Sequence, residues 1–191
     1  MYANSSPHPR RGFSLLELVI TLSLISILVG VVSFRSTAVL DKGKVSALAQ
    51  MADEMKTACA MYNSDTNQLP IEYAGGTPAQ RRLSASQTTI AGWAGPYLEK
   101  PLSDFGSNPF GRVRLYNRVN VGGWIPGFDV DGDGNVDVAT SGNMLWLTGI
   151  QEDIAESLDR TIDQGIPGAW ADTGSFRYNP GNLHAYILIF Q

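Results

Sequence analysis

The sequence predicts an α+β fold in which a long N-terminal helix, hydrophobic in its first half, packs on a small antiparallel β-sheet head with an extra C-terminal helix. Three observations predict it. An apolar run fills residues 13–34, an amphipathic helical period continues over 35–65, and turn formers with strand patterns occupy 66–191. The length of 191 residues suits one globular domain with an appendage.

The composition excludes several classes of protein. The chain has 14 Lys+Arg against 18 Asp+Glu and a formal net charge of −4, which argues against a basic nucleic-acid-binding protein, so no nucleic acid partner is expected. A hydrophobic content of 43% argues against a disordered chain or a protein with many membrane spans. The one cysteine, Cys59, has no partner for an intrachain disulfide.

The apolar run is predicted to cross a membrane. Residues 13–34 hold 15 apolar side chains in 22 positions, and as a helix they span about 33 Å, close to the roughly 30 Å of a hydrocarbon core. Arg10 and Arg11 precede the run, which favours a cytoplasmic amino terminus with the rest of the chain outside. A cleaved signal peptide has a shorter core, and a plain anchor leaves Glu17 unexplained.

The residues around the start of this run resemble a known processing site. Residues 10–18 read Arg-Arg-Gly-Phe-Ser-Leu-Leu-Glu-Leu and resemble the site of type IV prepilins and type II secretion pseudopilins, in which a prepilin peptidase cuts after the glycine and methylates the new amino terminus. The resemblance places the cut between Gly12 and Phe13 and the N-methylation on Phe13. Residues 1–12 are then a leader peptide, and its loss changes the formal charge from −4 to −6.

Glu17 becomes the fifth residue of the processed chain and is the candidate assembly residue. In a bundle of packed subunits, this carboxylate neutralises the cationic amine on Phe13 of a neighbour. An unpaired buried charge is strongly destabilising, so this pairing enforces the register between subunits even where its net contribution to stability is small.

The helix is predicted to continue beyond the apolar run, from residue 14 to about 64. Six residues follow one another at spacings of three and four, which places them on one helical face: Val45, Leu48, Ala52, Met55, Cys59 and Tyr62. The stripe covers fewer than three heptads, so packing against the head is favoured over a coiled coil. Cys59 is therefore expected to be a buried thiol rather than a nucleophile.

Two stretches narrow the resemblance to the major pseudopilin of type II secretion systems. Residues 61–70 are similar to that family's helix exit, and residues 95–111, rich in glycine and proline, are similar to its loop leading into the sheet. Residues 113–116 then alternate as a first strand does. The chain departs from the family pattern at Phe34, where a proline is common, and in its longer C-terminal region.

The acidic residues concentrate in one segment. No Lys or Arg occurs over 119–159, and the stretch 129–137 holds four aspartates. Crowded carboxylates repel one another, which a divalent cation relieves. The predicted ligands occupy loop positions one, three, five, seven and nine: Asp129, Asp131, Asp133, Asn135 and Asp137. This spacing predicts a structural calcium site.

The pattern differs from an EF-hand because position twelve is Thr140 instead of glutamate. It resembles the short calcium loops of integrin-type propeller repeats, although a single copy argues against a propeller. The pseudopilin resemblance also implies calcium binding in a C-terminal loop. The alternative is a polar turn stabilised by its glycines alone.

The C-terminal region is predicted to hold a helix and a hairpin. Thr148 with Gln151 resembles a capping box, and four isoleucine or leucine residues recur every four positions: Ile150, Ile154, Leu158 and Ile162. The acidic outer face of this 149–164 helix is expected to be solvated. A turn at residues 179–182 then joins residues 176–178 to 185–190, a last strand that is apolar on both faces and so central or covered.

No catalytic set is recognisable, so the chain is not expected to be an enzyme. His8 lies in the leader, His184 is the only other histidine, and Cys59 lies on the apolar stripe. The sequence instead predicts a structural filament subunit that assembles with other pilins or pseudopilins on an inner-membrane assembly platform after prepilin peptidase processing. Its predicted location is the bacterial inner membrane, single-pass with a periplasmic head, and later a periplasmic or cell-surface filament.

Two alternatives to a type II secretion pseudopilus remain open. One is a type IV pilus subunit acting in adhesion, motility or DNA uptake. The other is a membrane-anchored calcium-binding adhesion domain that never polymerises.

Overall fold

The computed structural model describes residues 12–164 and 166–191, with the side chains of residues 32–40 excepted. The chain divides into two compact units, Met1–Asp41 and Lys42–Gln191, each described here by itself. The buried residues of both hydrophobic clusters belong to the second unit. That unit therefore has a core of its own.

The predicted long helix is present as α1, Leu15–Thr66, which begins in the first unit and ends in the second. Ser14 precedes its first residue, and the Ser14 hydroxyl accepts a hydrogen bond from the backbone N–H of Leu16 at 3.1 Å, as a helix cap does. The helix ends where Asn67 adopts a left-handed backbone with φ of 54° and donates its N–H to the Asn63 carbonyl.

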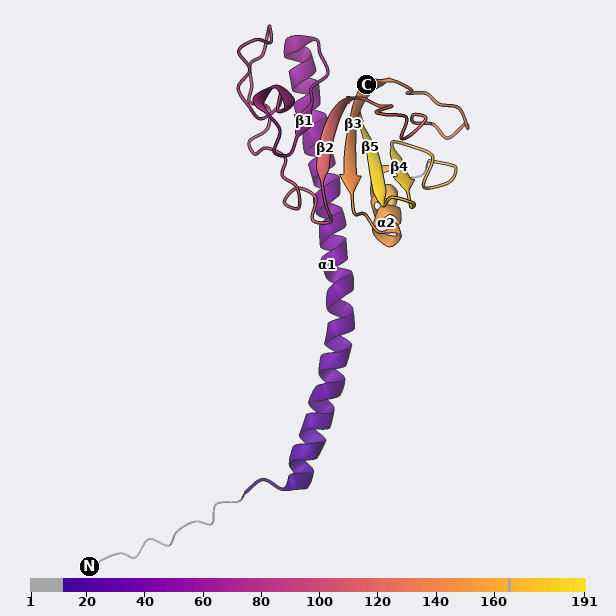
Figure 1. Ribbon diagram of the computed structural model, residues 1–191. Helices are drawn as coiled ribbons and strands as arrows, with labels where there is room; N and C mark the ends of the chain where they lie inside the picture. Colours follow the sequence, from indigo (N-terminus) through magenta and orange to yellow (C-terminus); the bar gives the residue numbers. More distant parts are fainter. Residues whose placement is uncertain (1–11, 165) are drawn as a thin grey trace, which may run out of the picture. The chain divides into compact units, whose positions relative to one another are not determined.

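The second unit contains an antiparallel sheet of five strands in the order β1-β2-β3-β5-β4 (Figure 1). The strands are β1 Glu72–Tyr73, β2 Val113–Arg118, β3 Ser141–Thr148, β4 Phe176–Asn179 and β5 His184–Phe190. The predicted terminal hairpin is confirmed as β4 and β5, and β5 is internal to the sheet, as its two apolar faces predict. The strand predicted from residue 113 is the second strand, because two-residue β1 precedes it.

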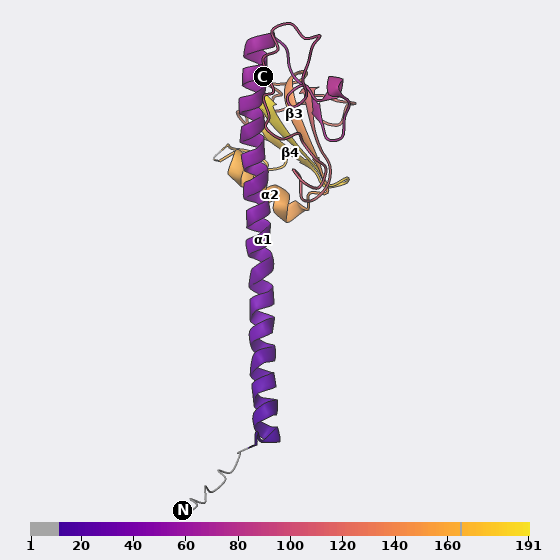
Figure 2. The ribbon, with the colours of Figure 1, turned by 90° about the vertical axis from the view of Figure 1, so that its left-hand side faces the viewer.

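The second-unit part of α1 packs across one face of this sheet (Figure 2). All six residues of the predicted stripe are buried there, which confirms the helical face read from the sequence. They share a cluster with residues of the sheet's inner face, which include Val113, Leu115, Leu145, Leu147, Ala185 and Ile187. A strand points successive side chains to opposite faces, so the residues between these point away from α1.

The outer face of the sheet is covered in part by the long connection from β2 to β3. Outer-face side chains and side chains of this connection form a second cluster: Tyr116, Val119, Val121, Ile125, Phe128, Val138, Met144, Trp146, Tyr186 and Leu188. The acidic stretch 129–137 lies within this connection.

The predicted C-terminal helix is α2, Glu152–Ile162, but the predicted capping box is wrong. Gln151 is the cap residue and makes no side-chain capping bond. The Thr148 hydroxyl instead accepts a hydrogen bond from the Arg112 N–H at 2.8 Å, and the Thr148 carbonyl accepts one from the Asn108 amide at 3.0 Å. Thr148 ends β3, so its polar atoms pair with the loop before β2 rather than with the helix.

Candidate functional site

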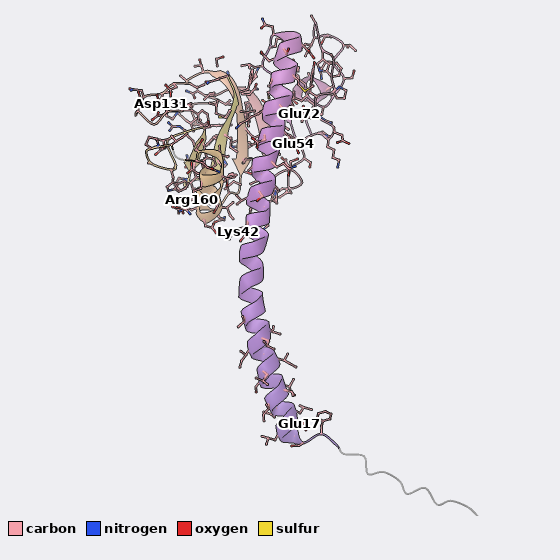
Figure 3. All side chains as sticks on the ribbon, turned by 180° about the vertical axis from the view of Figure 1, so that it is seen from behind. Glu17, Lys42, Glu54, Glu72, Asp131 and Arg160 are labelled. Carbon is pink, nitrogen blue, oxygen red and sulfur yellow. The ribbon has the colours of Figure 1, made fainter. Side chains whose placement is uncertain are left out.

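The N-terminal site consists of the residues around the predicted cut. Gly12 and Phe13 precede α1, and 82% of the Phe13 surface is exposed. Glu17 lies in the first turn of α1 and is exposed (Figure 3). A carboxylate is favoured there because the first turn carries unpaired N–H groups and the positive end of the helix dipole. Among the described residues, no hydrogen bond or ion pair joins Glu17 to another side chain.

The apolar side chains that follow are also uncovered within their own unit. Every large apolar side chain described between Phe13 and Val31 has more than half of its surface exposed. The hydroxyls among them are satisfied internally: Thr21, Ser23 and Ser26 each donate to a backbone carbonyl three or four residues earlier, at 2.8 to 2.9 Å. A helix with satisfied polar groups and an apolar surface is suited to apolar surroundings.

In the described part of the chain, no helix combines the length and the apolar character that crossing a membrane requires. The described side chains of the apolar run end at residue 31. The membrane span over residues 13–34 stays a prediction.

The acidic loop is the second candidate site, and its backbone wraps around Asp129. Only 4% of the Asp129 surface is exposed, and its two carboxylate oxygens accept the N–H groups of Gly132 at 2.8 Å and Gly134 at 2.9 Å. Asp137 closes the loop by accepting the Val130 N–H at 2.7 Å. Gly132 is required because its φ is 78° and a Cβ there would lie 2.2 Å from the Pro167 carbonyl oxygen.

Three of the five predicted ligands come together. Asp129, Asp131 and Asp137 each offer one carboxylate oxygen, and these three oxygens lie within 4.8 Å of one another. Asp133 is outside this group: it accepts the backbone N–H of Asn135 at 2.8 Å and its side-chain amide at 3.1 Å, and these bonds lower the pKa of Asp133. Ligation by Asp133 and Asn135 stays a prediction.

The donor chemistry of the loop fits calcium. Three carboxylates supply hard oxygen ligands, and Asp131 and Asp137 are exposed, which leaves room for water or a backbone carbonyl to complete the 6–8 ligands that calcium takes. The loop is also fixed to its surroundings, since the Asp129 carbonyl accepts the Gly174 N–H at 2.7 Å. Figure 3 places Asp131 on the part of the second unit away from α1.

The structure also buries carboxylates that sequence reasoning missed. Glu72 is fully buried on β1 and accepts the N–H groups of Leu83 at 3.0 Å and Ser84 at 3.3 Å, together with the Ser84 hydroxyl. Burial raises the pKa of Glu72, and this effect outweighs the lowering of the pKa by these hydrogen bonds. Its role is to hold the segment after β1 to the sheet, and no sequence pattern marks it.

The expectation that the acidic face of α2 is solvated is wrong for Asp159. Only 7% of its surface is exposed, and burial, with the nearby Asp163 carboxylate, raises its pKa to about 6. Asp163 is half-buried and accepts the N–H groups of Ser175 and Phe176 at 2.9 and 2.7 Å. Residues four apart lie on the same face of a helix, and Ala155 is buried. The spacing between Ala155 and Asp159 could therefore have placed Asp159 on the buried face of α2.

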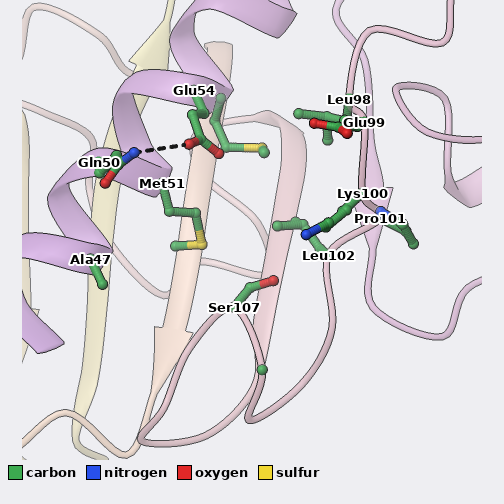
Figure 4. A pocket seen from close by; sticks show the side chains of 12 residues that line it. Ala47, Gln50, Met51, Glu54, Leu98, Glu99, Lys100, Pro101, Leu102 and Ser107 are labelled. Atoms are coloured by element: carbon green, nitrogen blue, oxygen red, sulfur yellow. Dashed lines mark hydrogen bonds between the residues drawn. The ribbon is translucent and has the colours of Figure 1, made fainter.

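An open pocket of about 430 Å³ lies between α1 and the 98–107 loop of the second unit (Figure 4). Gln50 and Glu54 line it from α1, where the Gln50 amide donates to the Glu54 carboxylate at 3.4 Å. Neither a histidine nor a cysteine lines this pocket, and the Ser107 hydroxyl accepts the Ser103 N–H. The lining therefore presents no activated nucleophile.

The cysteine and the histidine of the second unit both pack against neighbouring side chains. Cys59 is fully buried on the α1 stripe, and burial raises the pKa of its thiol, which keeps it neutral. His184 packs edge-on against Trp146 with ring centroids 5.1 Å apart, and burial lowers the pKa of its imidazole.

A comparison with known families bears on the N-terminal site alone. Residues 7–33 match the prokaryotic N-terminal methylation motif. The chain carries this type IV pilin-like signal. The N-terminal methylation motif implies processing by prepilin peptidase, membrane anchoring and assembly with other pilins, and it covers Gly12, Phe13 and Glu17. Nothing matches the chain significantly among curated proteins or among solved structures. The α+β architecture that follows the motif agrees with a pilin-like fold.

Proposed function

We propose that this protein is a structural filament subunit of a type II secretion pseudopilus. The N-terminal methylation motif carries the proposal, because it stands at the start of a helix whose described apolar side chains are exposed within their own unit. Such a surface needs either lipid or neighbouring subunits to cover it. The core of the second unit, which includes the second-unit part of α1, supports a head that folds independently of the apolar run.

In the proposed mechanism, processing creates the assembly contact. Prepilin peptidase cuts between Gly12 and Phe13, which leaves a methylated cationic amine on Phe13. In the filament, the exposed Glu17 carboxylate of one subunit pairs with the amine of the next. The subunit waits in the inner membrane with its head in the periplasm, and the assembly platform then inserts it into the growing filament.

The type II secretion assignment rests on the stretches 61–70 and 95–111, which resemble the major pseudopilin. The rival is a type IV pilus subunit, which shares the N-terminal motif. Deletion of the gene separates the two: loss of enzyme export with surface pili intact supports the pseudopilus, and loss of surface pili with export intact supports the pilus.

We propose that calcium binds the acidic loop and that its role is structural. Asp129, Asp131 and Asp137 supply carboxylate oxygens, and the ion offsets their mutual repulsion. The bound ion thus holds the connection that covers the outer face of the sheet. We propose no catalytic role for the protein.

The experiment that tests the main proposal is mass spectrometry of the mature protein isolated from membranes. The expected amino terminus is N-methylated Phe13, and an unmethylated chain that begins elsewhere contradicts the proposal. Sheared filaments provide the second readout. Recovery of the chain in them excludes a membrane-anchored adhesion domain that never polymerises.

A further inference from the structure

One part of the outer sheet face combines arginines with aromatic rings. This arginine–aromatic face consists of Tyr73 on β1, Arg114 and Arg118 on β2, and Trp124 in the connection after β2. The Arg114 guanidinium lies 5.4 Å from the centre of the Tyr73 ring and 5.7 Å from that of Trp146, so it is held between two rings. Arg118 ends the same strand, is exposed, and directly precedes Val119 of the outer-face cluster.

The charge of this face is uncompensated within its own unit. Across the described residues, no hydrogen bond or ion pair joins Arg114 or Arg118 to a carboxylate, and both side chains reach solvent. Trp124 is 43% exposed although it packs on Tyr116 and Trp146. Arginine, tryptophan and tyrosine are the side chains most enriched at the centres of protein interfaces, and a guanidinium held between rings loses little entropy when it binds a carboxylate.

A patch of opposite charge lies at the other edge of the same sheet. The first turn of α2 carries Glu152 and Asp153, both exposed and without a basic partner among the residues described. This acidic turn lies close to β4, because the Tyr178 hydroxyl on β4 donates to the carbonyl of Ile150, two residues before Glu152, at 2.9 Å. Figure 1 shows α2 beside β4, the edge strand opposite β1 and β2.

We propose that the arginine–aromatic face of one copy binds the acidic turn of α2 of a second copy. Two complementary patches near opposite edges of one sheet cannot satisfy each other within a copy, but they can between copies. Such a head-to-tail contact leaves one patch free on each end, so it can repeat from copy to copy, and it builds a helical array where the rotation between copies does not close a ring. The proposal rests on the proposed filament function and assigns one of the contacts between heads.

A crosslinking experiment on the full chain in bacterial membranes tests the contact directly. Arg118→Cys and Asp153→Cys are introduced together, and a short bismaleimide is added; buried Cys59 stays unreactive. We expect a ladder of dimers, trimers and higher species from the double variant and none from either single variant. Coexpression of the two single variants should give dimers only. A dimer from Arg118→Cys alone means that like faces meet, and it overturns the proposal.

Charge reversal gives a second, independent test through the yield of sheared filaments. Arg118→Glu, alone and with Arg114→Glu, should lower the yield about tenfold or more, because like charges then face each other. Glu152→Lys with Asp153→Lys should lower it similarly, and the combination of both reversals should restore it. The control is Lys100→Glu, an equal change of charge at an exposed position outside both patches, which should leave the yield unchanged.

The outcomes separate this contact from the proposed function. If the wild-type chain forms filaments, but the double-cysteine variant gives no ladder and the filament yield tolerates both reversals, the contact is overturned and the filament function stays in place. A wild-type chain that forms no filaments overturns both. Melting temperatures of the reversal variants identify any loss of yield that comes from unfolding, and restoration by the combined variant is the result that a folding defect cannot produce.

Discussion

Replacement of Asp131 by asparagine should have opposite effects on stability with and without calcium. The Asp131 and Asp137 carboxylates and the Asp129 carboxylate offer oxygens within 4.8 Å of one another, so without an ion they repel. Asp131→Asn removes one charge from this group and keeps the shape of the side chain. The variant should therefore be slightly more stable than the wild type in chelator and less stable in calcium.

The size of the calcium effect follows from linkage. At a free calcium concentration of 100 times the Kd, binding to the native state alone adds about 2.7 kcal/mol. For a domain of the size of Lys42–Gln191, each kcal/mol shifts the Tm by about 2–4 °C. The wild type should then melt about 5–11 °C higher in calcium than in chelator. Loss of a carboxylate ligand should remove most of that difference.

The assay is thermal unfolding, followed by circular dichroism, of a fragment that begins near residue 36 and contains both buried clusters. Each protein is melted in excess calcium and in excess chelator. Glu99→Gln serves as the matched control, because it removes one exposed negative charge far from the loop in sequence. Identical wild-type melts in calcium and chelator would refute the reasoning, and so would an Asp131→Asn variant that keeps the full calcium shift.

Three further predictions concern single carboxylates. Glu72→Ala should lower the free energy of unfolding by about 2–4 kcal/mol, since it leaves a buried donor at Leu83 and half-buried donors at Ser84 unpaired; Glu72→Gln should cost less, and an unchanged urea midpoint for the alanine variant contradicts the role. Asp159 has a raised pKa, so the folded state binds its proton more tightly than the unfolded chain and stability falls as pH rises from about 4 through 6. Asp159→Asn should therefore stabilise the protein by roughly 1–3 kcal/mol at pH 7.5 and by little at pH 4, as measured by urea unfolding at both values; equal effects at the two pH values refute it. Glu17→Ala should leave membrane insertion intact and exclude the subunit from filaments; mutant subunits at wild-type levels in sheared filaments remove the proposed role.

The sequence predicted the elements whose patterns are local. The stripe from Val45 to Tyr62 repeats at the helical period, so its burial could be read without knowing what covers it. The terminal hairpin was recognisable from a turn between two apolar runs. Strand β3 was not predicted, because buried residues on both faces remove the alternation that marks a strand.

Of the candidate sites, the N-terminal motif is determined by the sequence alone, because a peptidase reads a short linear stretch and a helix dipole acts within one turn.

The acidic loop depends on both sequence and tertiary structure. The spacing identified its residues, but only the folded backbone decided that Asp129, Asp131 and Asp137 meet while Asp133 bonds to Asn135. The burial of Glu72 and Asp159, and the placement of Arg114 between rings of β1 and β3, belong to the tertiary structure. They depend on strand order and helix packing, which bring together residues that no local period relates.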